Sequence, residues 1–253
     1  MQPEGVFEQE LFMEESLILE TRDLERDFGG IKAVRGVTFR LRRGELRCLI
    51  GPNGAGKSTF FKLVTGQLRP TSGTILFDGR EISRLPPHSI GRLGIAIKNQ
   101  IPSIYDGLSM RENLWIAARS RHSMPSATRL ANELIERLQM TESASQTVGT
   151  LAHGQRQWVE IGMVMAQRPR LVLLDEPTAG MAADEIARTV SLVRELNRDA
   201  SVIVVEHDMQ FVRQLDAVVT VFVQGQILVE DRMDVVLRNA RVRAVYLGSA
   251  EDA

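Results

Sequence analysis

Three short runs in this chain are apolar, namely residues 46–50, in which Arg47 is the one exception, and residues 171–174 and 202–205, which are wholly apolar. A strand that is exposed on one face alternates apolar and polar residues, whereas a strand that is buried on both faces is apolar throughout. Each run has the length of a strand rather than of a helix. We therefore predict three buried strands that belong to one parallel sheet.

The first third of the chain has a different, β-like composition. Short apolar or β-branched stretches at residues 17–19, 37–41 and 74–77 predict strands, and Gly29-Gly30 marks a turn between the first two. The segment 69–73, Arg-Pro-Thr-Ser-Gly, predicts a turn before the third. These features indicate that the first third of the chain is rich in strands.

Residues 109–140 change to a helical period. Ser109 and Glu112 have the spacing of a capping box, which predicts a helix start at this point. A second predicted helix follows, with one apolar face formed by Leu130, Leu134, Ile135 and Leu138. A third helix is expected to follow Gly154 and to stop at Pro169.

Composition narrows the class of protein. The 253 residues are 43% hydrophobic, which is enough for a substantial core, and 31 Lys and Arg face 32 Asp and Glu. With no basic surplus we expect no nucleic-acid partner. The single cysteine, Cys48, excludes an internal disulfide and is expected to be a packed core thiol. No apolar run approaches the roughly 20 residues of a membrane span, so we expect a soluble chain.

A glycine-rich segment follows the first apolar run directly. It matches the pattern G-x-x-x-x-G-K-[S/T] of a nucleotide phosphate loop, with a predicted strand before it and a predicted helix from about Phe60 after it. Backbone N–H groups of such a loop surround phosphate oxygens, and the helix N-terminus adds positive potential. The alternative is a glycine-rich turn without a ligand. The segment consists of Gly51, Pro52, Asn53, Gly54, Ala55, Gly56, Lys57, Ser58 and Thr59.

Within this loop two side chains have specific chemistry. Lys57 is expected to reach the β- and γ-phosphates of a nucleoside triphosphate, and the Ser58 hydroxyl is expected to bind Mg²⁺.

The other apolar runs end in residues that phosphoryl transfer can use. Asp175 closes one run and is a candidate ligand of Mg²⁺, usually through water, while Glu176 is a candidate general base for the attacking water. His207 follows the third run and is a candidate sensor of the γ-phosphate. The alternative for each is a strand-end polar residue that is merely solvated. Because the carboxyl ends of parallel strands meet at one edge of a sheet, we expect these residues to face the phosphate loop.

These residues resemble those of the ATP-binding cassette ATPases, and the resemblance covers about residues 16–248. It implies an α/β fold with a RecA-like P-loop core, a mostly parallel sheet, an antiparallel β subdomain and an inserted helical subdomain at about residues 101–168. Residues 1–15, which are rich in glutamate, and residues 249–253 are then tails. A short amphipathic helix is the alternative for the first tail. The further matching positions are Phe28, Gln100, the signature at residues 151–155, and His207.

The resemblance also implies roles for these positions. Phe28 would stack on adenine, and Val34 belongs to the same nucleotide-binding set. Gln100 would act in catalysis and, with Ser58 and Asp175, at Mg²⁺. The signature would contact the ATP of a partner subunit through Ala152, His153, Gly154 and Gln155.

Several strings narrow the resemblance to the branch that takes up branched-chain amino acids. They are residues 153–163, 179–181, 204–209 and 245–248, and the combination of His153 with Trp158 is most similar to the urea-importer ATPase subunit. The implied protein hydrolyses ATP for an importer. Its partners would be a second ATPase subunit, integral membrane permease subunits and, indirectly, an external solute-binding protein. It would lie in the cytoplasm, on the inner face of the membrane.

Some positions depart from the family pattern. The usual signature serine is Ala152, and Ala182 and Ala183 replace the usual residues of the D-loop. Asn99 precedes Gln100 where an aromatic residue is frequent. These departures affect the groups that the chain would lend to a partner. They leave open the alternative of a nucleotide-binding regulatory subunit with degenerate partner-facing motifs. A soluble cassette ATPase outside transport is a separate alternative.

Overall fold

The computed structural model describes residues 17–98 and 104–248, and its largest sheet has six strands in the order β10-β9-β3-β8-β7-β6. Neighbouring strands from β9 to β6 are parallel, and β10 is antiparallel to β9. The strands are β3 (Leu46–Ile50), β6 (Ile95–Lys98), β7 (Leu171–Asp175), β8 (Ser201–Val205), β9 (Val218–Val223) and β10 (Gln226–Arg232). The three apolar runs are therefore the adjacent strands β3, β8 and β7, as predicted.

A second, antiparallel sheet has the order β2-β1-β4-β5. Its strands are β1 (Leu17–Phe28), β2 (Ile31–Arg42), β4 (Ser72–Phe77) and β5 (Arg80–Glu81). The turn predicted at residues 69–73 is too long, because β4 already begins at Ser72. Gly73 lies inside this strand, at an irregularity in its pairing with β1, where a Cβ would lie 2.3 Å from the Asp23 carbonyl oxygen. A glycine at such a bulge continues the strand rather than ending it.

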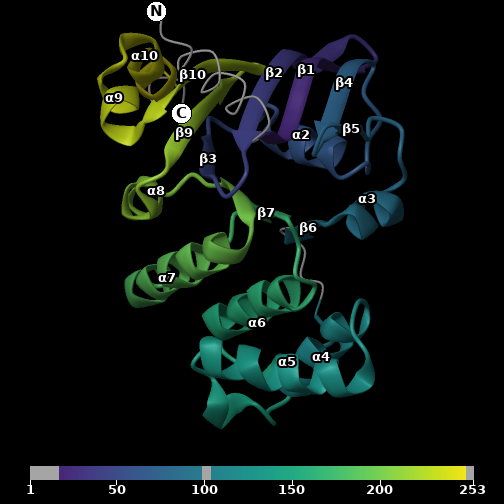
Figure 1. Cartoon of the computed structure of the whole chain (residues 1–253). Helices are drawn as coiled ribbons and strands as arrows, with labels where there is room; N and C mark the ends of the chain where they lie inside the picture. The colour runs from purple at the N-terminus through teal and green to yellow at the C-terminus, as the bar shows by residue number, and fades with distance from the viewer. Residues whose placement is uncertain (1–16, 99–103, 249–253) are drawn as a thin grey trace, which may run out of the picture.

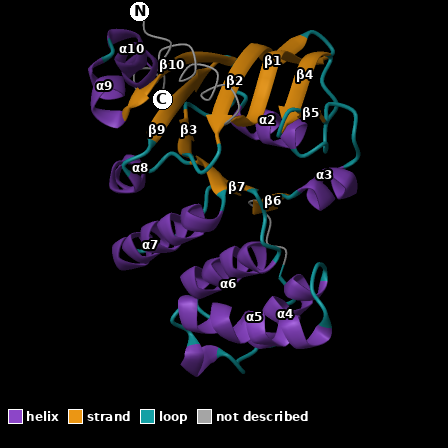
Figure 2. Ribbon diagram, viewed as in Figure 1, coloured by secondary structure: helices purple, strands orange, loops and turns teal. Residues whose placement is uncertain are grey.

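Helices cover both faces of the six-stranded sheet and form a separate layer at the end opposite the antiparallel sheet (Figures 1 and 2). The α/β class with an antiparallel unit and an inserted helical layer is confirmed. The layer contains α4 (Met110–Arg119), α5 (Met124–Arg137) and α6 (His153–Ala166), with 3₁₀ turns at Thr141–Ser143 and Val148–Thr150. The other helices are α2 (Lys57–Val64), α3 (Pro87–Leu93), α7 (Ala183–Asp199), α8 (Met209–Leu215), α9 (Met233–Arg238) and α10 (Ala240–Gly248).

Local sequence signals set the starts and packed faces of the helical layer. The Ser109 hydroxyl accepts a bond from the Glu112 N–H, and the Glu112 carboxylate accepts one from the Ser109 N–H, so the capping box is confirmed. The predicted apolar face of α5 is buried. No helix among the described residues is long and apolar enough to cross a membrane. The tails at 1–15 and 249–253, and residues 101–103 of the predicted subdomain, lie outside the described residues.

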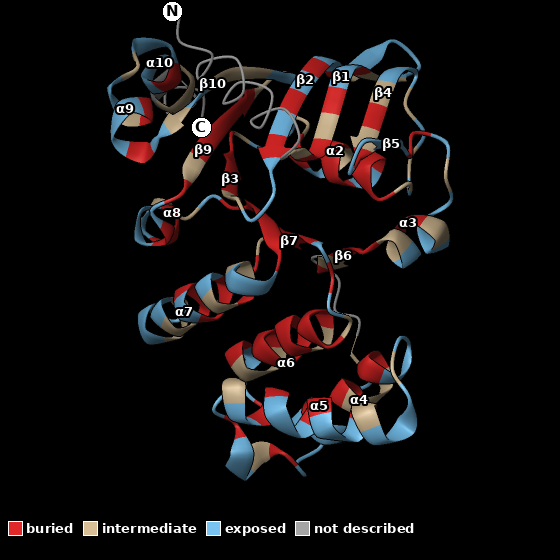
Figure 3. Cartoon of the chain, viewed as in Figure 1, coloured by how far each residue is buried: buried red, intermediate tan, exposed pale blue. Residues whose placement is uncertain are grey.

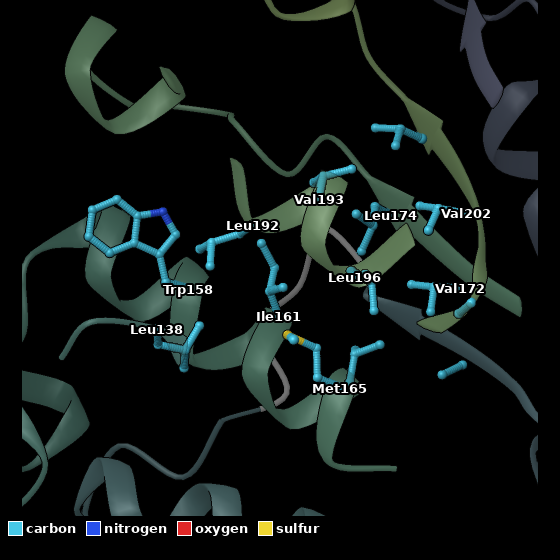
Figure 4. Packing of buried hydrophobic residues seen from close by; sticks show 14 of the residues in the cluster. Leu138, Trp158, Ile161, Met165, Val172, Leu174, Leu192, Val193, Leu196 and Val202 are labelled. Carbon is cyan, nitrogen blue, oxygen red and sulfur yellow. The ribbon is translucent and has the colours of Figure 1, made fainter. Parts of the chain in front are cut away.

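Two hydrophobic clusters hold the fold together, and Figure 3 shows which segments of the chain are buried. One lies between the antiparallel sheet, α2 and one face of the six-stranded sheet, with Phe39, Phe60 and Phe222 in contact. The other joins the opposite face of that sheet to the helical layer, and Cys48 is buried in it. Figure 4 shows the junction of α6 and α7 with the sheet, where the labelled side chains are Leu138, Trp158, Ile161, Met165, Val172, Leu174, Leu192, Val193, Leu196 and Val202.

Candidate functional site

The phosphate-loop segment follows β3 directly, as predicted, but α2 begins at Lys57 rather than at Phe60, so the last residues of the segment form the first turn of the helix. Two of its glycines are required by close backbone approaches and by positive φ. A Cβ at Gly51 would lie 2.1 Å from the Phe222 carbonyl oxygen, and one at Gly56 would lie 2.3 Å from the Ala33 carbonyl oxygen. The loop backbone therefore contacts β9 at Gly51 and β2 at Gly56. These two contacts fix the path of the loop around the space that phosphates would occupy.

Lys57, the first residue of α2, lies across the inside of this loop. Its Nζ donates to the Gly51 carbonyl at 2.6 Å and to the Pro52 carbonyl at 3.0 Å. Burial lowers the pKa of Lys57, and the nearby carboxylates Glu176 and Asp175 oppose that shift. The ammonium group is thus held in the loop, at a point from which it can meet an anion.

A cleft of about 220 Å³ opens over the loop. Residues 53–59 form most of its wall, Ala33 of β2 forms one side, and Glu176 lies at the far side. The structure therefore brings the phosphate loop and the end of β7 together, as the parallel-sheet argument predicts.

Asp175 ends β7 and is 8% exposed. Burial raises its pKa to about 6, the Glu176 charge adds to the rise, and the Lys98 and Lys57 ammonium groups oppose it. Its Oδ1 atom is buried and has no hydrogen-bond partner within the described part of the chain. A buried oxygen without a donor, in a site with excess negative charge, fits the ligand set of a hard cation such as Mg²⁺.

Glu176 and His207 face each other across the ends of β7 and β8. The Glu176 N–H donates to the Val205 carbonyl at 2.9 Å, and the residue has φ +47°, which turns the chain out of the strand. His207 Nδ1 lies 3.6 Å from Glu176 Oε1. The carboxylate lines the cleft, and the imidazole beside it is exposed to solvent.

Glu206 is a site residue that sequence reasoning missed. It is fully buried, and its carboxylate accepts bonds from the Thr178 N–H at 3.0 Å, the Thr178 hydroxyl at 2.7 Å and the His207 N–H at 3.1 Å. It therefore ties the segment after Glu176 to the histidine. The available signal was a charged residue placed directly after a wholly apolar run.

The remaining predicted nucleotide-site residues differ in where the structure places them. Phe28 ends β1 and is 43% exposed, and the Arg26 guanidinium lies 4.5 Å from its ring centroid. Val34 is fully buried in the core between the sheets, and its neighbour Ala33 is the residue of β2 that lines the cleft. Gln100 lies outside the described residues. The nucleotide roles of these three residues stay predictions.

The signature residues begin α6, away from the lining of the cleft. The Ala152 N–H donates to the Gln155 side chain, and His153 Nε2 lies 2.9 Å from the Ala179 carbonyl oxygen in the segment after Glu176. A Cβ at Gly154 would lie 2.2 Å from the Glu185 carboxylate of α7. The signature thus packs against the D-loop segment of its own chain, on a surface that the chain's own phosphate loop does not share.

Comparisons with known proteins give a consistent result. A family model described as "ABC transporter" matches residues 34–179. The chain is 35% identical over 251 residues to a high-affinity branched-chain amino acid transport ATP-binding protein, BraF, of Pseudomonas aeruginosa, with 92% of this chain and 98% of the relative covered.

A second relative and a solved structure agree with this match. The branched-chain amino acid transport ATP-binding protein LivG of Escherichia coli is 31% identical, with the same two coverages. The ADP conformation of MJ1267, an ATP-binding cassette of an ABC transporter, superposes with a TM-score of 0.82 at 28% identity, covering 92% of this chain and 99% of that one.

Proposed function

This chain is an ATPase of the ABC transporter family, and we propose that it powers an importer of a small polar solute. The observation that carries ATP hydrolysis is the position of Lys57 and Glu176 in the lining of one cleft, next to Asp175 at the end of β7, and the importer role rests on the transport relatives. A phosphate-binding ammonium, a buried metal-type carboxylate and an accessible carboxylate at the cleft wall are the set that ATP hydrolysis requires.

Each residue has a distinct task in this mechanism. The loop N–H groups and Lys57 bind the phosphates and hold the γ-phosphate in place. Glu176 takes a proton from the attacking water, and His207, at 3.6 Å from that carboxylate, contacts the γ-phosphate. Ser58, Gln100 and Asp175 would hold Mg²⁺, which supplies positive charge next to the phosphate oxygens. Phe28 supports the adenine by stacking.

The names of the relatives support one class of solute. BraF and LivG are named for branched-chain amino acid transport, and both match this chain over 92% of its length. This supports a branched-chain amino acid or a related amide as the solute. Urea, which the signature string of this chain favours, stays a prediction.

The working unit is a pair of ATPase subunits on a membrane permease, on the cytoplasmic face of the membrane. In such a pair each phosphate loop faces the signature of the other subunit.

All residues that this chain provides to its own ATP have their usual type, whereas Ala152 and Ala182 lack the side chains that would be lent to a partner. The starts of α6 and α7 are correspondingly without a side-chain bond from the N-cap residue. This asymmetry favours a heterodimer with one strong and one weak site.

Isolation of the tagged chain from native membranes tests the proposal. We expect a second ATPase subunit and integral membrane proteins to accompany it, and the assembly to hydrolyse ATP. Lys57→Ala should abolish both tight ATP binding and hydrolysis, because it removes the cation at the phosphates. Recovery without any membrane protein would favour the soluble alternative. Nucleotide binding without turnover in the complete assembly would favour the regulatory alternative.

A further inference from the structure

Lys98 is a buried cation that the mechanism above does not use. It is the last residue of β6, at the edge of the six-stranded sheet, and it pairs in register with Leu174 of β7, next to Asp175. Its side chain is 2% exposed, and its Nζ lies 3.4 Å from Oε2 of Glu160, which is 6% exposed. A lysine this deeply buried needs a partner that compensates its desolvation.

Glu160, the anionic member of the pair, lies in the helical layer. It belongs to α6, two helical turns after the signature residue His153, and α6 packs directly on β6. The chain leaves the sheet after Lys98 to build the helical layer, and α6 brings it back to β7. The ion pair therefore joins β6, which precedes the helical layer, to α6, the last helix of that layer.

The surroundings of Lys98 also link it to the nucleotide site. Its register partner on β7 is Leu174, and the next residue of that strand is Asp175. The ammonium group thus pairs with the signature helix and lies on the strand beside the one that ends at the nucleotide site. Lys98 itself does not line the cleft.

We propose that the Lys98–Glu160 pair is a positioning element that fixes the signature helix against the sheet and thereby sets the rate of ATP hydrolysis in the assembled transporter. The inference rests on the proposed function, since the signature acts on a partner's ATP. Neither residue touches nucleotide. The pair therefore governs turnover and leaves ATP binding, which the phosphate loop performs, unchanged.

A set of substitutions separates positioning from stability. Lys98→Met removes the cation that faces Glu160, and loss of one member of a buried pair should lower the Tm by roughly 6 to 20 °C. Combining it with Glu160→Met replaces both charges by apolar side chains of similar length, and most of the Tm should return. In this stable double variant we expect the kcat of the assembly to fall at least about tenfold with KM for ATP within about twofold, because small misplacements of a catalytic assembly cost about 10² in rate.

Arg47→Met is the matched control. Arg47 of β3 is 9% exposed and paired with Glu45 and with Glu230 of β10, and neither β3 nor β10 is next to β6 in the sheet. The loss of Arg47 should therefore lower the Tm without changing kcat. A double variant with wild-type Tm and a kcat within threefold of wild type overturns the proposal, and so does a KM that rises in step with the fall in kcat. A wild-type assembly without ATP hydrolysis would instead refute the proposed function.

A spectroscopic measurement on the isolated chain tests positioning without turnover. Spin labels at Lys62→Cys of α2 and Glu136→Cys of α5 occupy exposed positions, and the single native cysteine, Cys48, is buried. We expect a narrow distance distribution with the native pair and a clearly broader one in the Lys98→Met/Glu160→Met background. An unchanged distribution overturns the inference whatever the ATPase result.

Discussion

Replacing Asp175 by asparagine should stabilise the nucleotide-free, metal-free chain while it abolishes function. Asp175 is buried beside Glu176, and its Oδ1 has no donor within the described residues, so the folded chain must hold a poorly compensated negative charge. Asparagine has nearly the same shape and no charge. The site is thus expected to be a place where the fold gives up stability for Mg²⁺ binding.

The magnitude follows from the pKa of this carboxyl group. This pKa rises from an ordinary value of 3.8 to about 6 in the folded chain, mainly through burial. The rise corresponds to a loss of folding free energy of about 3 kcal/mol when Asp175 is ionised. Because the folded-state pKa is the higher one, the native chain binds more protons than the unfolded chain within this interval. Stability therefore falls as the pH rises from about 4 to 6, and the full penalty applies above pH 6.

Urea denaturation in EDTA, without nucleotide, measures the effect at pH 8 and pH 5. We expect Asp175→Asn to raise the free energy of unfolding by about 1 to 3 kcal/mol at pH 8 and by about half as much at pH 5. The control is Asp184→Asn, at an exposed position in the first turn of α7. There the same substitution removes a charge that favours the helix dipole and should cost about 0.3 to 1 kcal/mol. A variant less stable than wild type at pH 8, or a gain equal at both pH values, would refute the reasoning.

Three further predictions concern nucleotide chemistry. Glu176→Gln should lower kcat by about 10² to 10⁴ and leave the Kd for ATP within about threefold, measured by single turnover and by calorimetry; hydrolysis within a few-fold of wild type would mean another base. Phe28→Ala should weaken ATP binding by about 1 to 3 kcal/mol, and an unchanged Kd would assign the adenine to another side chain. Ala152→Ser should raise turnover of the weak site by roughly tenfold to a hundredfold in the complete assembly; no increase, together with equal losses from general-base mutants of either subunit, contradicts the asymmetry.

Chemistry that depends on local spacing could be predicted from the sequence. The spacing of the glycines and the lysine identified the phosphate loop, although the carbonyl groups that require glycine at Gly51 and Gly56 lie on the distant strands β9 and β2. Two continuous apolar runs identified β7 and β8, and a short run that is apolar except for Arg47 identified β3. The geometry of a parallel sheet then placed Asp175 and Glu176 beside the loop.

Close approaches between distant segments were not predictable in the same way. Gly73 continues a strand instead of ending it because β1 passes within van der Waals range, and this neighbour lies about 50 residues away in the sequence. The same holds for β2, where the pairing register turns Val34 into the core and leaves Ala33 at the cleft.

Buried charges also depended on the tertiary structure. Glu206 and Lys98 each follow an apolar run, and the sequence contains nothing that separates a solvated strand-end charge from a buried one. Burial comes from elements far along the chain, Thr178 for the carboxylate and Glu160 of α6 for the ammonium. Short-range patterns thus determined which groups gather at the edge of the sheet. Packing of the helical layer onto that edge decided which of them contact solvent and which are paired inside.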